Sequence, residues 1–295
     1  MLSVCLKKSR KMSGKSASQA RLREGRRSSL LCLFAAGLLL LSGCTSLRYA
    51  GVDRIVTYRI TSPDVPAEAD GYRMAFATDF HLPSLFTERE LRATVRALKD
   101  LRPDVIMLGG DYQEGCEAVD VLFSALSECA PPDGIYAVLG NNDYERCTDE
   151  IRRSMAHYGI RNLEYAADTI RPWLVVAGVP YCTHPPLVTP LTDSLADSLF
   201  SVLLTHTPDI VESAAVLPAQ VDLALAGHTH GGQITFFYIV APETGSRYGR
   251  RFLYGKNRTT SGVPVITSRG LGTSRIPVRF CAPTDIVVVE LKHAG

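Results

Sequence analysis

The sequence predicts an α/β fold, in which apolar strands alternate with amphipathic helices along the chain. Two observations lead to this prediction. Short apolar runs recur from residue 72 onward, and each stops at a glycine or a polar residue. Segments with the helical spacing of apolar residues follow the first of these runs. This order of strand, polar loop and helix is typical of α/β proteins.

The clearest elements lie between residues 72 and 139. Tyr72–Thr78 has the composition of a strand, and Glu88–Leu101 has three apolar residues on one helical face. Thr87 and Glu90 have the spacing of a capping box, which starts a helix. The next predicted elements are a strand at Val105–Leu108, a helix at Ala118–Cys129 and a strand at Gly134–Leu139.

The second half is less regular. We expect a helix at Thr148–Tyr158, a short helix late in residues 189–200, and a helix capped by Asp209 that runs to Leu217. Further strands are predicted at Leu174–Val179, Ser201–Leu204, Val221–Ala226, Val263–Ser268 and Asp285–Leu291.

The N-terminal segment has the features of an export signal. An apolar run at Leu30–Leu41 follows Arg26 and Arg27, and its length suits a signal-peptide core better than a membrane span. It ends in Leu41-Ser42-Gly43-Cys44, which resembles the lipobox of bacterial lipoproteins, where the cysteine is lipidated. An uncleaved N-terminal anchor is the alternative. The arginine pair faintly resembles a twin-arginine signal.

The predicted organisation has three parts. Residues 1–43 would be a lipoprotein signal peptide, 44–71 the lipidated N-terminus and stalk, and 72–295 the catalytic domain. Residues 45–70 could form either an extended stalk or an edge strand. Lipidation of Cys44 would place an exported domain on the outer side of the cytoplasmic membrane or at the outer membrane.

Charge is distributed unevenly between the leader and the rest. Residues 1–43 contain nine Lys and Arg against one acid, so the remaining 23 basic and 29 acidic residues leave a net charge of −6. An acidic folded region argues against a nuclease or another nucleic-acid binder. We expect a monomer.

Five cysteines lie outside the leader and the lipobox, and no CxxC pair occurs among them. One or two disulfides are possible in an oxidising compartment, with at least one thiol unpaired. The five are Cys116, Cys129, Cys147, Cys182 and Cys281.

Metal-type ligands follow five of the apolar runs. His228 and His230 are two positions apart, so on an extended chain their side chains point the same way. Sites in open α/β sheets form at the carboxyl ends of strands, where such ligands would meet. Carboxylate, imidazole and amide oxygen together suit Mn, Fe or Zn. The set is Asp79, His81, Asp111, Asn141, His206, His228 and His230.

The motif order DxH, GD, GN, H and GHxH resembles the calcineurin-like metallophosphoesterase superfamily, over roughly residues 72–291. The segments His228–Ile234 and Gly270–Arg279 are similar to the bacterial YkuE/YaeI-like secreted phosphodiesterase subfamily. The resemblance implies a four-layer α/β/β/α sandwich and two divalent metal ions. It also implies that a bridging hydroxide attacks phosphorus.

The family pattern assigns each ligand to one metal. The first would be held by Asp79, His81, Asp111 and His230. The second would be held by Asp111, Asn141, His206 and His228. Asp111 would therefore bridge the two ions and belong to the catalytic machinery.

One catalytic position departs from the family pattern. The family has a histidine that contacts phosphate and helps to protonate the leaving group, and Asn142 occupies its place. An amide can donate a hydrogen bond but cannot deliver a proton at neutral pH. General acid help contributes roughly 100- to 10,000-fold. His184 could replace that donor, or it could be a structural or surface histidine.

Residues 246–284 hold eight basic residues and no acid, among them Arg275 and Arg279. They could bind an anionic substrate or form an ordinary solvated face. Residues 236–240, with sequence FFYIV, could form an apolar wall for an acyl chain or pack in the core.

These observations predict a dimetal phosphodiesterase or pyrophosphatase at the cell envelope. Its substrate would be a phosphoester, with a phosphorylated lipid or another envelope compound as the natural candidate. The alternative is a catalytically weak, metal-bound envelope protein that binds phosphoesters or partners. Asn142 motivates that alternative, whereas the complete ligand set favours the enzyme.

Overall fold

The computed structural model describes residues 51–181, 188–193, 195, 199–212, 216–236 and 240–295. Cys44, Cys182 and His184 therefore lie outside the described residues. Across these ranges, no helix is both long enough and apolar enough to cross a membrane.

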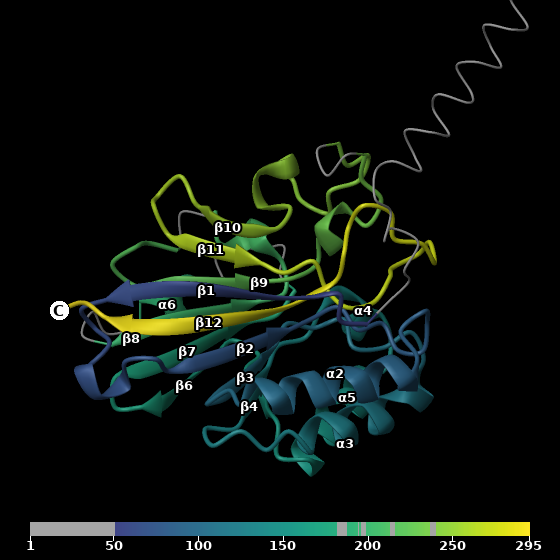
Figure 1. Cartoon of the computed structure of the whole chain (residues 1–295), viewed down its shortest axis with the longest axis horizontal. Coiled ribbons are helices and arrows are strands. Elements are labelled where there is room, and N and C mark those ends of the chain that lie inside the picture. The colour runs from purple at the N-terminus through teal and green to yellow at the C-terminus, as the bar shows by residue number, and fades with distance from the viewer. Residues whose placement is uncertain (1–50, 182–187, 194, 196–198, 213–215, 237–239) are drawn as a thin grey trace, which may run out of the picture. The chain divides into compact units, whose positions relative to one another are not determined.

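Six strands form the first sheet, which carries three of the predicted ligand loops (Figure 1). β12 pairs in parallel with β1 and antiparallel with β2, and the remaining pairs are parallel. In spatial order the strands are β1 (Arg54–Ser62), β12 (Asp285–His293), β2 (Arg73–Ala77), β3 (Val105–Leu108), β4 (Ile135–Ala137) and β5 (Arg161–Asn162).

The second sheet also has six strands and carries the remaining ligand loops. Its four central strands are parallel, and an antiparallel strand lies at each edge. In spatial order they are β10 (Gly255–Arg258), β11 (Pro264–Thr267), β9 (Leu223–Ala226), β8 (Phe200–Thr205), β7 (Leu174–Val179) and β6 (Ala166–Arg171).

Alternation along the strands builds two cores on the first sheet. On β2, Met74 and Phe76 pack toward the second sheet, whereas Ala75 and Ala77 face helices on the outer side. These are α2 (Glu88–Leu101), α3 (Val119–Ser127) and α5 (Thr148–His157). Both faces of a largely parallel sheet are thus covered, which explains the fully apolar strand β3 and the buried run 74–77 of β2.

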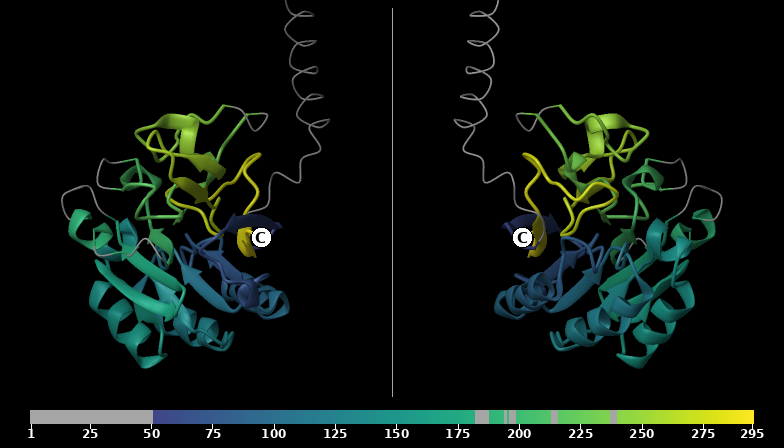
Figure 2. Two further views of the ribbon diagram at one scale, coloured as in Figure 1. Left: turned by 90° about the vertical axis from the view of Figure 1, so that its left-hand side faces the viewer. Right: turned by 90° about the vertical axis from the view of Figure 1, so that its right-hand side faces the viewer.

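The outer face of the second sheet has a thinner cover. Ile210 and Phe252 pack there with Leu203 and Val265. The covering elements are α6 (Thr189–Thr192), η4 (Pro208–Ile210) and η6 (Gly249–Phe252). Figure 2 shows the blue and teal helices at one side of the molecule and the light green segments at the other. The predicted α/β/β/α sandwich is confirmed.

Several predicted elements match the observed ones. The helix Glu88–Leu101 and the strand Val105–Leu108 have the predicted bounds, and Thr87 with Glu90 forms the capping box. The strands β5 and β6 and the 3-10 turn η6 were not anticipated. The same holds for η1 (Ala67–Ala69), η2 (Cys116–Ala118), α4 (Asn141–Glu145) and η5 (His230–Gly232).

The predicted cap at Asp209 is wrong. The Thr207 side chain caps a single 3-10 turn there, since its hydroxyl accepts from the Asp209 N–H. The Asp209 carboxylate instead accepts from Ser246 and from the backbone N–H of Arg247. The predicted continuation to Leu217 passes through residues 213–215, which are outside the described residues.

Residues 54–62 form the edge strand rather than a free stalk. β1 pairs with β12 along its whole length, from Arg54 beside Asp285 to Ser62 beside His293. The Gly51 N–H also donates to the Leu271 carbonyl at 3.0 Å. The folded unit therefore begins upstream of residue 72.

A chain shortened to 72–295 should be less stable than one shortened to 46–295. It loses the β1 pairing, in which each backbone hydrogen bond contributes on the order of 1 kcal/mol. A total loss of about 3 kcal/mol or more would lower Tm by roughly 6–12 °C. Thermal unfolding of the two chains measures the difference, and equal Tm values would show that β1 is dispensable.

Candidate metal centre

The predicted ligands converge where the two sheets end. Asp79 and His81 follow β2, and Asp111 follows β3. His206 follows β8 in the second sheet, while Asn141 starts α4. Because the strands are parallel to their neighbours, these loops emerge at the same edge of each sheet. His228 and His230 follow β9 and complete the set.

The backbone at this edge has an unusual conformation. Five ligand residues have φ between 51° and 71°, in the left-handed region. That conformation costs a residue other than glycine roughly 1–2 kcal/mol. Its concentration at one place indicates that the surrounding hydrogen bonds hold the ligands against local preference. The five are Asp79, His81, Asp111, His228 and His230.

Two glycines permit the ligand loops to approach one another. A Cβ on Gly140 would lie 2.1 Å from Oδ1 of Asp111. A Cβ on Gly227 would lie 2.4 Å from the Thr78 hydroxyl and 2.6 Å from Oδ2 of Asp79. A side chain at either position would push a metal-ligating carboxylate away.

The first cluster consists of four buried residues whose ligand atoms all lie within 4.8 Å of one another: Asp79, His81, Asp111 and His230. Nε2 of His81 is 3.2 Å from Nε2 of His230 and 3.5 Å from Oδ2 of Asp111. Nε2 of His230 is 3.5 Å from Oδ1 of Asp79. Four donors therefore face one point.

The second cluster shares Asp111 with the first. It adds His206 and His228, again with ligand atoms within 4.8 Å of one another. Nε2 of His206 lies 3.0 Å from Nδ1 of His228, 3.1 Å from Oδ1 of Asn141 and 3.5 Å from Oδ2 of Asp111. The structure therefore brings all seven predicted ligands together in two groups joined by one carboxylate.

Hydrogen bonds set which imidazole nitrogen faces the centre. Nδ1 of His81 donates to Oε1 of Glu114 at 2.6 Å, and Nδ1 of His206 donates to the Gly109 carbonyl at 2.7 Å. In each neutral ring, Nε2 then carries the lone pair that a metal requires. The bond from His206 also joins the second sheet to the first.

The electrostatics of the clusters suit cations. Burial, together with the charge of Asp111, raises the pKa of Asp79. Burial and the neighbouring His206 lower the pKa of His228 to about 4, and burial likewise lowers the pKa of His230. Neutral imidazoles coordinate metals, whereas two buried carboxylates this close repel each other. The donor set fits two divalent cations.

Glu114 is a site residue that the sequence analysis missed. The strands that carry His81 and Asp111 remain paired beyond β2 and β3, because the Glu114 N–H donates to the Leu82 carbonyl at 2.8 Å. This pairing places the Glu114 carboxylate behind the His81 ring. A carboxylate three residues after Asp111, in the same loop, was the available signal.

Asn142 has both ends of its carboxamide engaged by the protein. Its Nδ2 donates to Oε1 of Glu114 at 3.0 Å, and its Oδ1 accepts from Nδ2 of Asn141 at 3.0 Å. Its backbone N–H donates to Oδ1 of Asp111 at 2.9 Å. The residue therefore stabilises the ligand loops, and its amide cannot act as a general acid at neutral pH.

The buried Asp143 side chain stabilises the two loops that carry Asp111 and Asn141. Its carboxylate accepts from the backbone N–H groups of Asp111, Gly140 and Tyr112 at 2.7–3.0 Å. Burial raises the pKa of Asp143 to about 7, and the charge of Asp111 adds to the effect. This single side chain thus fixes the backbone on both sides of the bridging ligand.

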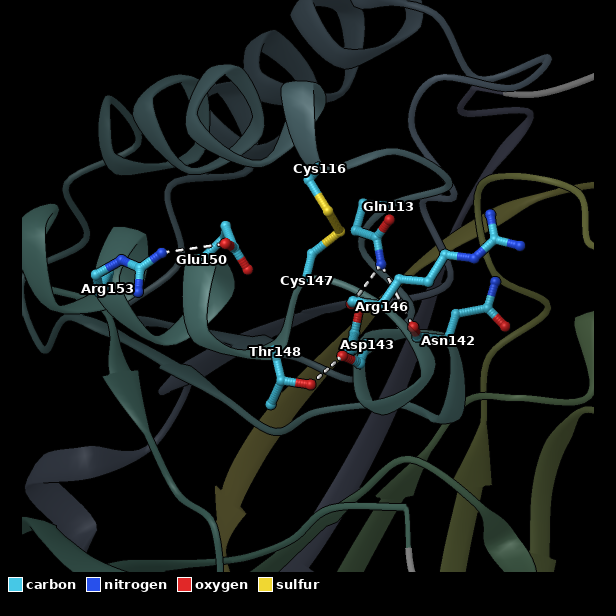
Figure 3. Close-up of a disulfide and its surroundings, with 9 residues drawn as sticks. All are labelled: Gln113, Cys116, Asn142, Asp143, Arg146, Cys147, Thr148, Glu150 and Arg153. Carbon is cyan, nitrogen blue, oxygen red and sulfur yellow. Dashed lines mark hydrogen bonds and ion pairs between the residues drawn. A yellow bond between two sulfur atoms is a disulfide. The ribbon is translucent and has the colours of Figure 1, made fainter.

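A disulfide joins the two loops that flank this side of the centre (Figure 3). It links Cys116, two residues after Glu114, to Cys147 at the start of α5. Nε2 of Gln113 donates to the Arg146 carbonyl at 3.0 Å and to the Asn142 carbonyl at 3.4 Å, alongside the bridge. Cys129 remains a thiol, as the odd number of cysteines predicts.

Arg279, which the sequence suggested as a substrate-binding residue, lies inside the protein rather than on its surface. The side chain is buried, and its guanidinium donates to the carbonyls of Gly272, His230, Ala282 and Arg269. Its Nη2 also lies 3.1 Å from Nδ1 of His230. Arg279 therefore holds the loop that carries His230 through the His230 backbone carbonyl.

Three of the eight basic residues in 246–284 have acidic partners. Arg247 pairs with Asp209, Arg251 with Glu212, and Arg269 with Asp285. The acids come from other parts of the chain, which is why the local sequence suggested an uncompensated charge.

Two further side chains lie at or near the centre. Arg275 is exposed, and its charge adds to burial and to His206 in lowering the pKa of His228. The ring of Tyr181, which the sequence analysis missed, has its centroid 5.8 Å from that of His228 and 6.1 Å from that of His206.

Two candidate cation sites that share one carboxylate, at the strand ends of an α/β/β/α sandwich, are the arrangement expected of a dimetal hydrolase. Residues 72–232 match the family model of the calcineurin-like phosphoesterases, and the chain belongs to this family. The protein is therefore a metal-dependent phosphoesterase.

Two relatives are similar over most of the chain. An "uncharacterized metallophosphoesterase" of Aquifex aeolicus is 30% identical over 250 residues, covering 82% of this chain and 93% of its own. The "uncharacterized metallophosphoesterase YkuE" of Bacillus subtilis is 30% identical over 252 residues, covering 81% and 85%. Among solved structures, a dimetal phosphatase from Danio rerio shares 12% identity with a TM-score of 0.42, covering 70% of this chain and 90% of that one.

Glu114→Gln should weaken metal binding while leaving the fold intact. The amide oxygen can still accept from His81, but the charge that makes its ring a stronger ligand is lost. Changes to such supporting partners typically lower metal affinity about 10- to 100-fold. Mn titration against a chelator measures the effect. Glu117→Gln, which alters an exposed carboxylate in the same loop, is the control, and equal affinities for both variants would contradict the role of Glu114.

Proposed function

We propose that this phosphoesterase hydrolyses phosphodiesters or pyrophosphates whose leaving group departs without a protein-derived proton, and that it acts at the cell envelope. The observation that supports this most is the group of seven donors arranged around the shared Asp111. When bound, two cations would supply positive charge to the phosphoryl oxygens and lower the pKa of water.

The chain's own residues would hold and orient this centre. Asp79, His81 and His230 complete one side, and His206, His228 and Asn141 complete the other. Hydrogen bonds from His81 to Glu114 and from His206 to Gly109 keep the imidazoles in the form that binds metal. The surroundings are therefore preorganised for two cations.

The leaving group follows from Asn142. A carboxamide does not release a proton at neutral pH, and that of Asn142 is held by Glu114 and Asn141. Without general acid help, the reaction is fast only for leaving groups that are stable as anions, such as phosphate or a phenolate. This supports a diphosphate or an activated diester over a simple alkyl phosphodiester.

An extracytoplasmic location is supported by two features. The Cys116–Cys147 disulfide is typical of proteins that fold in an oxidising compartment. The leader and lipobox predict export and lipidation of Cys44. We propose a phosphorylated lipid or another envelope compound as the natural substrate.

Exposed apolar residues support a lipid-linked substrate. Phe236, Val240 and Ile276 are each about half exposed, with fractions of 47%, 54% and 55%. Phe236 and Val240 thus do not pack in the core. The segment between them is outside the described residues.

A hydrolysis assay separates the enzyme from a metal-bound binding protein. Full-length protein loaded with Mn should hydrolyse bis(4-nitrophenyl) phosphate, and Asp111→Ala should abolish this activity because both cation sites lose their shared ligand. Turnover no greater than that of Asp111→Ala, on this ester and on a diphosphate, would favour the binding protein.

Asn142→His should change the leaving-group preference. An imidazole beside Glu114 could deliver a proton, so turnover of an alkyl phosphodiester should rise by roughly 100-fold. Turnover of the aryl ester should change little, because its leaving group needs no proton. Equal effects on the two substrates would contradict the proposed role of Asn142.

A further inference from the structure

Gln233 ties the loop that carries Arg275 to the metal-binding segment. Its Nε2 donates to the carbonyls of Ser274 at 3.0 Å and Ile276 at 2.8 Å, and its Oε1 accepts from the Ser274 N–H at 2.8 Å. These three bonds reach the residues on both sides of Arg275. The Gln233 carboxamide therefore binds the backbone on both sides of this arginine.

Gln233 is itself fixed to the metal centre. It follows η5, and its N–H donates to the carbonyl of the ligand His230 at 3.0 Å. Its own carbonyl accepts from the Phe280 N–H at 2.8 Å. Gln233 thus connects the backbone around Arg275 to the backbone of His230.

Only a carboxamide satisfies this arrangement. Two backbone carbonyls require two N–H donors, and one backbone N–H requires an acceptor, which is the full capacity of the glutamine side chain as used here. A glutamate of the same shape would leave both carbonyls without a donor and would repel them. The hydrogen-bonding groups of residue 233 therefore matter as well as its size.

Arg275 differs from the other arginines around it. Arg247, Arg251 and Arg269 have acidic partners, whereas Arg275 forms no ion pair within the described part of the chain. Its backbone is in the left-handed region, with φ of 59°. Arg275 is exposed, and Gln233 joins the residues on both sides of it to the His230 backbone. Its charge also contributes to the lowered pKa of His228. An exposed guanidinium without an acidic partner is available to bind an anion.

We infer that Gln233 is a positioning residue that holds the Arg275 guanidinium at the mouth of the metal centre to bind the leaving phosphate of a diphosphate substrate. The inference rests on the proposed function. A guanidinium gives up no proton at neutral pH, but it stabilises the charge that appears on a departing phosphate. It would thus compensate for the absence of a proton donor at Asn142.

The test is a double-mutant cycle in the full-length, Mn-loaded protein. Gln233→Glu and Arg275→Gln should each lower kcat/KM for a dialkyl diphosphate by about 10- to 100-fold, with smaller losses for bis(4-nitrophenyl) phosphate. The double variant should have the same kcat/KM as Arg275→Gln alone, because Gln233 acts on the substrate only through the arginine. Lys256→Gln removes the same charge from an exposed position and should have no effect.

A second measurement does not depend on turnover. Calorimetric titration with inorganic phosphate should show a similar loss of affinity in the two single variants, and no further loss in the double variant, with metal content unchanged. If Gln233→Glu fails to fold, Gln233→Met removes the same hydrogen bonds without adding a charge.

Three results would overturn the inference: wild-type phosphate affinity in the Gln233 variants, equal losses with both substrates, or additive losses in the double variant. Failure of the proposed function is distinguishable, because the wild type would then show no turnover above Asp111→Ala. The phosphate titration would still decide the coupling of Gln233 to Arg275.

Discussion

The centre depends on two buried carboxylates that face each other. Asp79 and Asp111 sit at the ends of adjacent strands, and burial with mutual repulsion raises the pKa of Asp79. Four imidazoles surround them, of which His228 and His230 have lowered pKa values and supply little positive charge of their own. Burying such a set is costly unless cations neutralise it. The surrounding architecture can be understood as the means of keeping these groups together.

That architecture works through backbone and supporting side chains. Left-handed backbone turns the ligands inward, and Gly140 and Gly227 leave space for the carboxylates. Asp143 holds the loops of the first sheet, and Arg279 holds the His230 loop of the second. Each support uses hydrogen bonds that exist without a metal, so the geometry is set before any cation binds.

The sequence predicted the ligands because each follows an apolar run, and because the order of the motifs resembles a known family. Parallel pairing of β2 and β3 brings Asp79 and Asp111 to one edge. His206 follows a strand of the second sheet, so its approach depends on the packing of the two sheets. The supports were harder to predict. Arg279 looked like a residue that could bind an anionic substrate. The nearby sequence does not show that its loop folds inward and buries the side chain. Glu114 was missed because its importance arises from pairing beyond β2 and β3, and cysteine spacing cannot specify the Cys116–Cys147 pair.

The central claim is that two cations share Asp111, and anomalous diffraction from crystals grown with Mn tests it most directly. We expect two anomalous peaks about 4 Å apart, with the Asp111 carboxylate in coordination distance of both. One peak should also contact Asp79, His81 and His230, and the other Asn141, His206 and His228. A single peak at saturating Mn, or two peaks without Asp111 between them, would contradict the account.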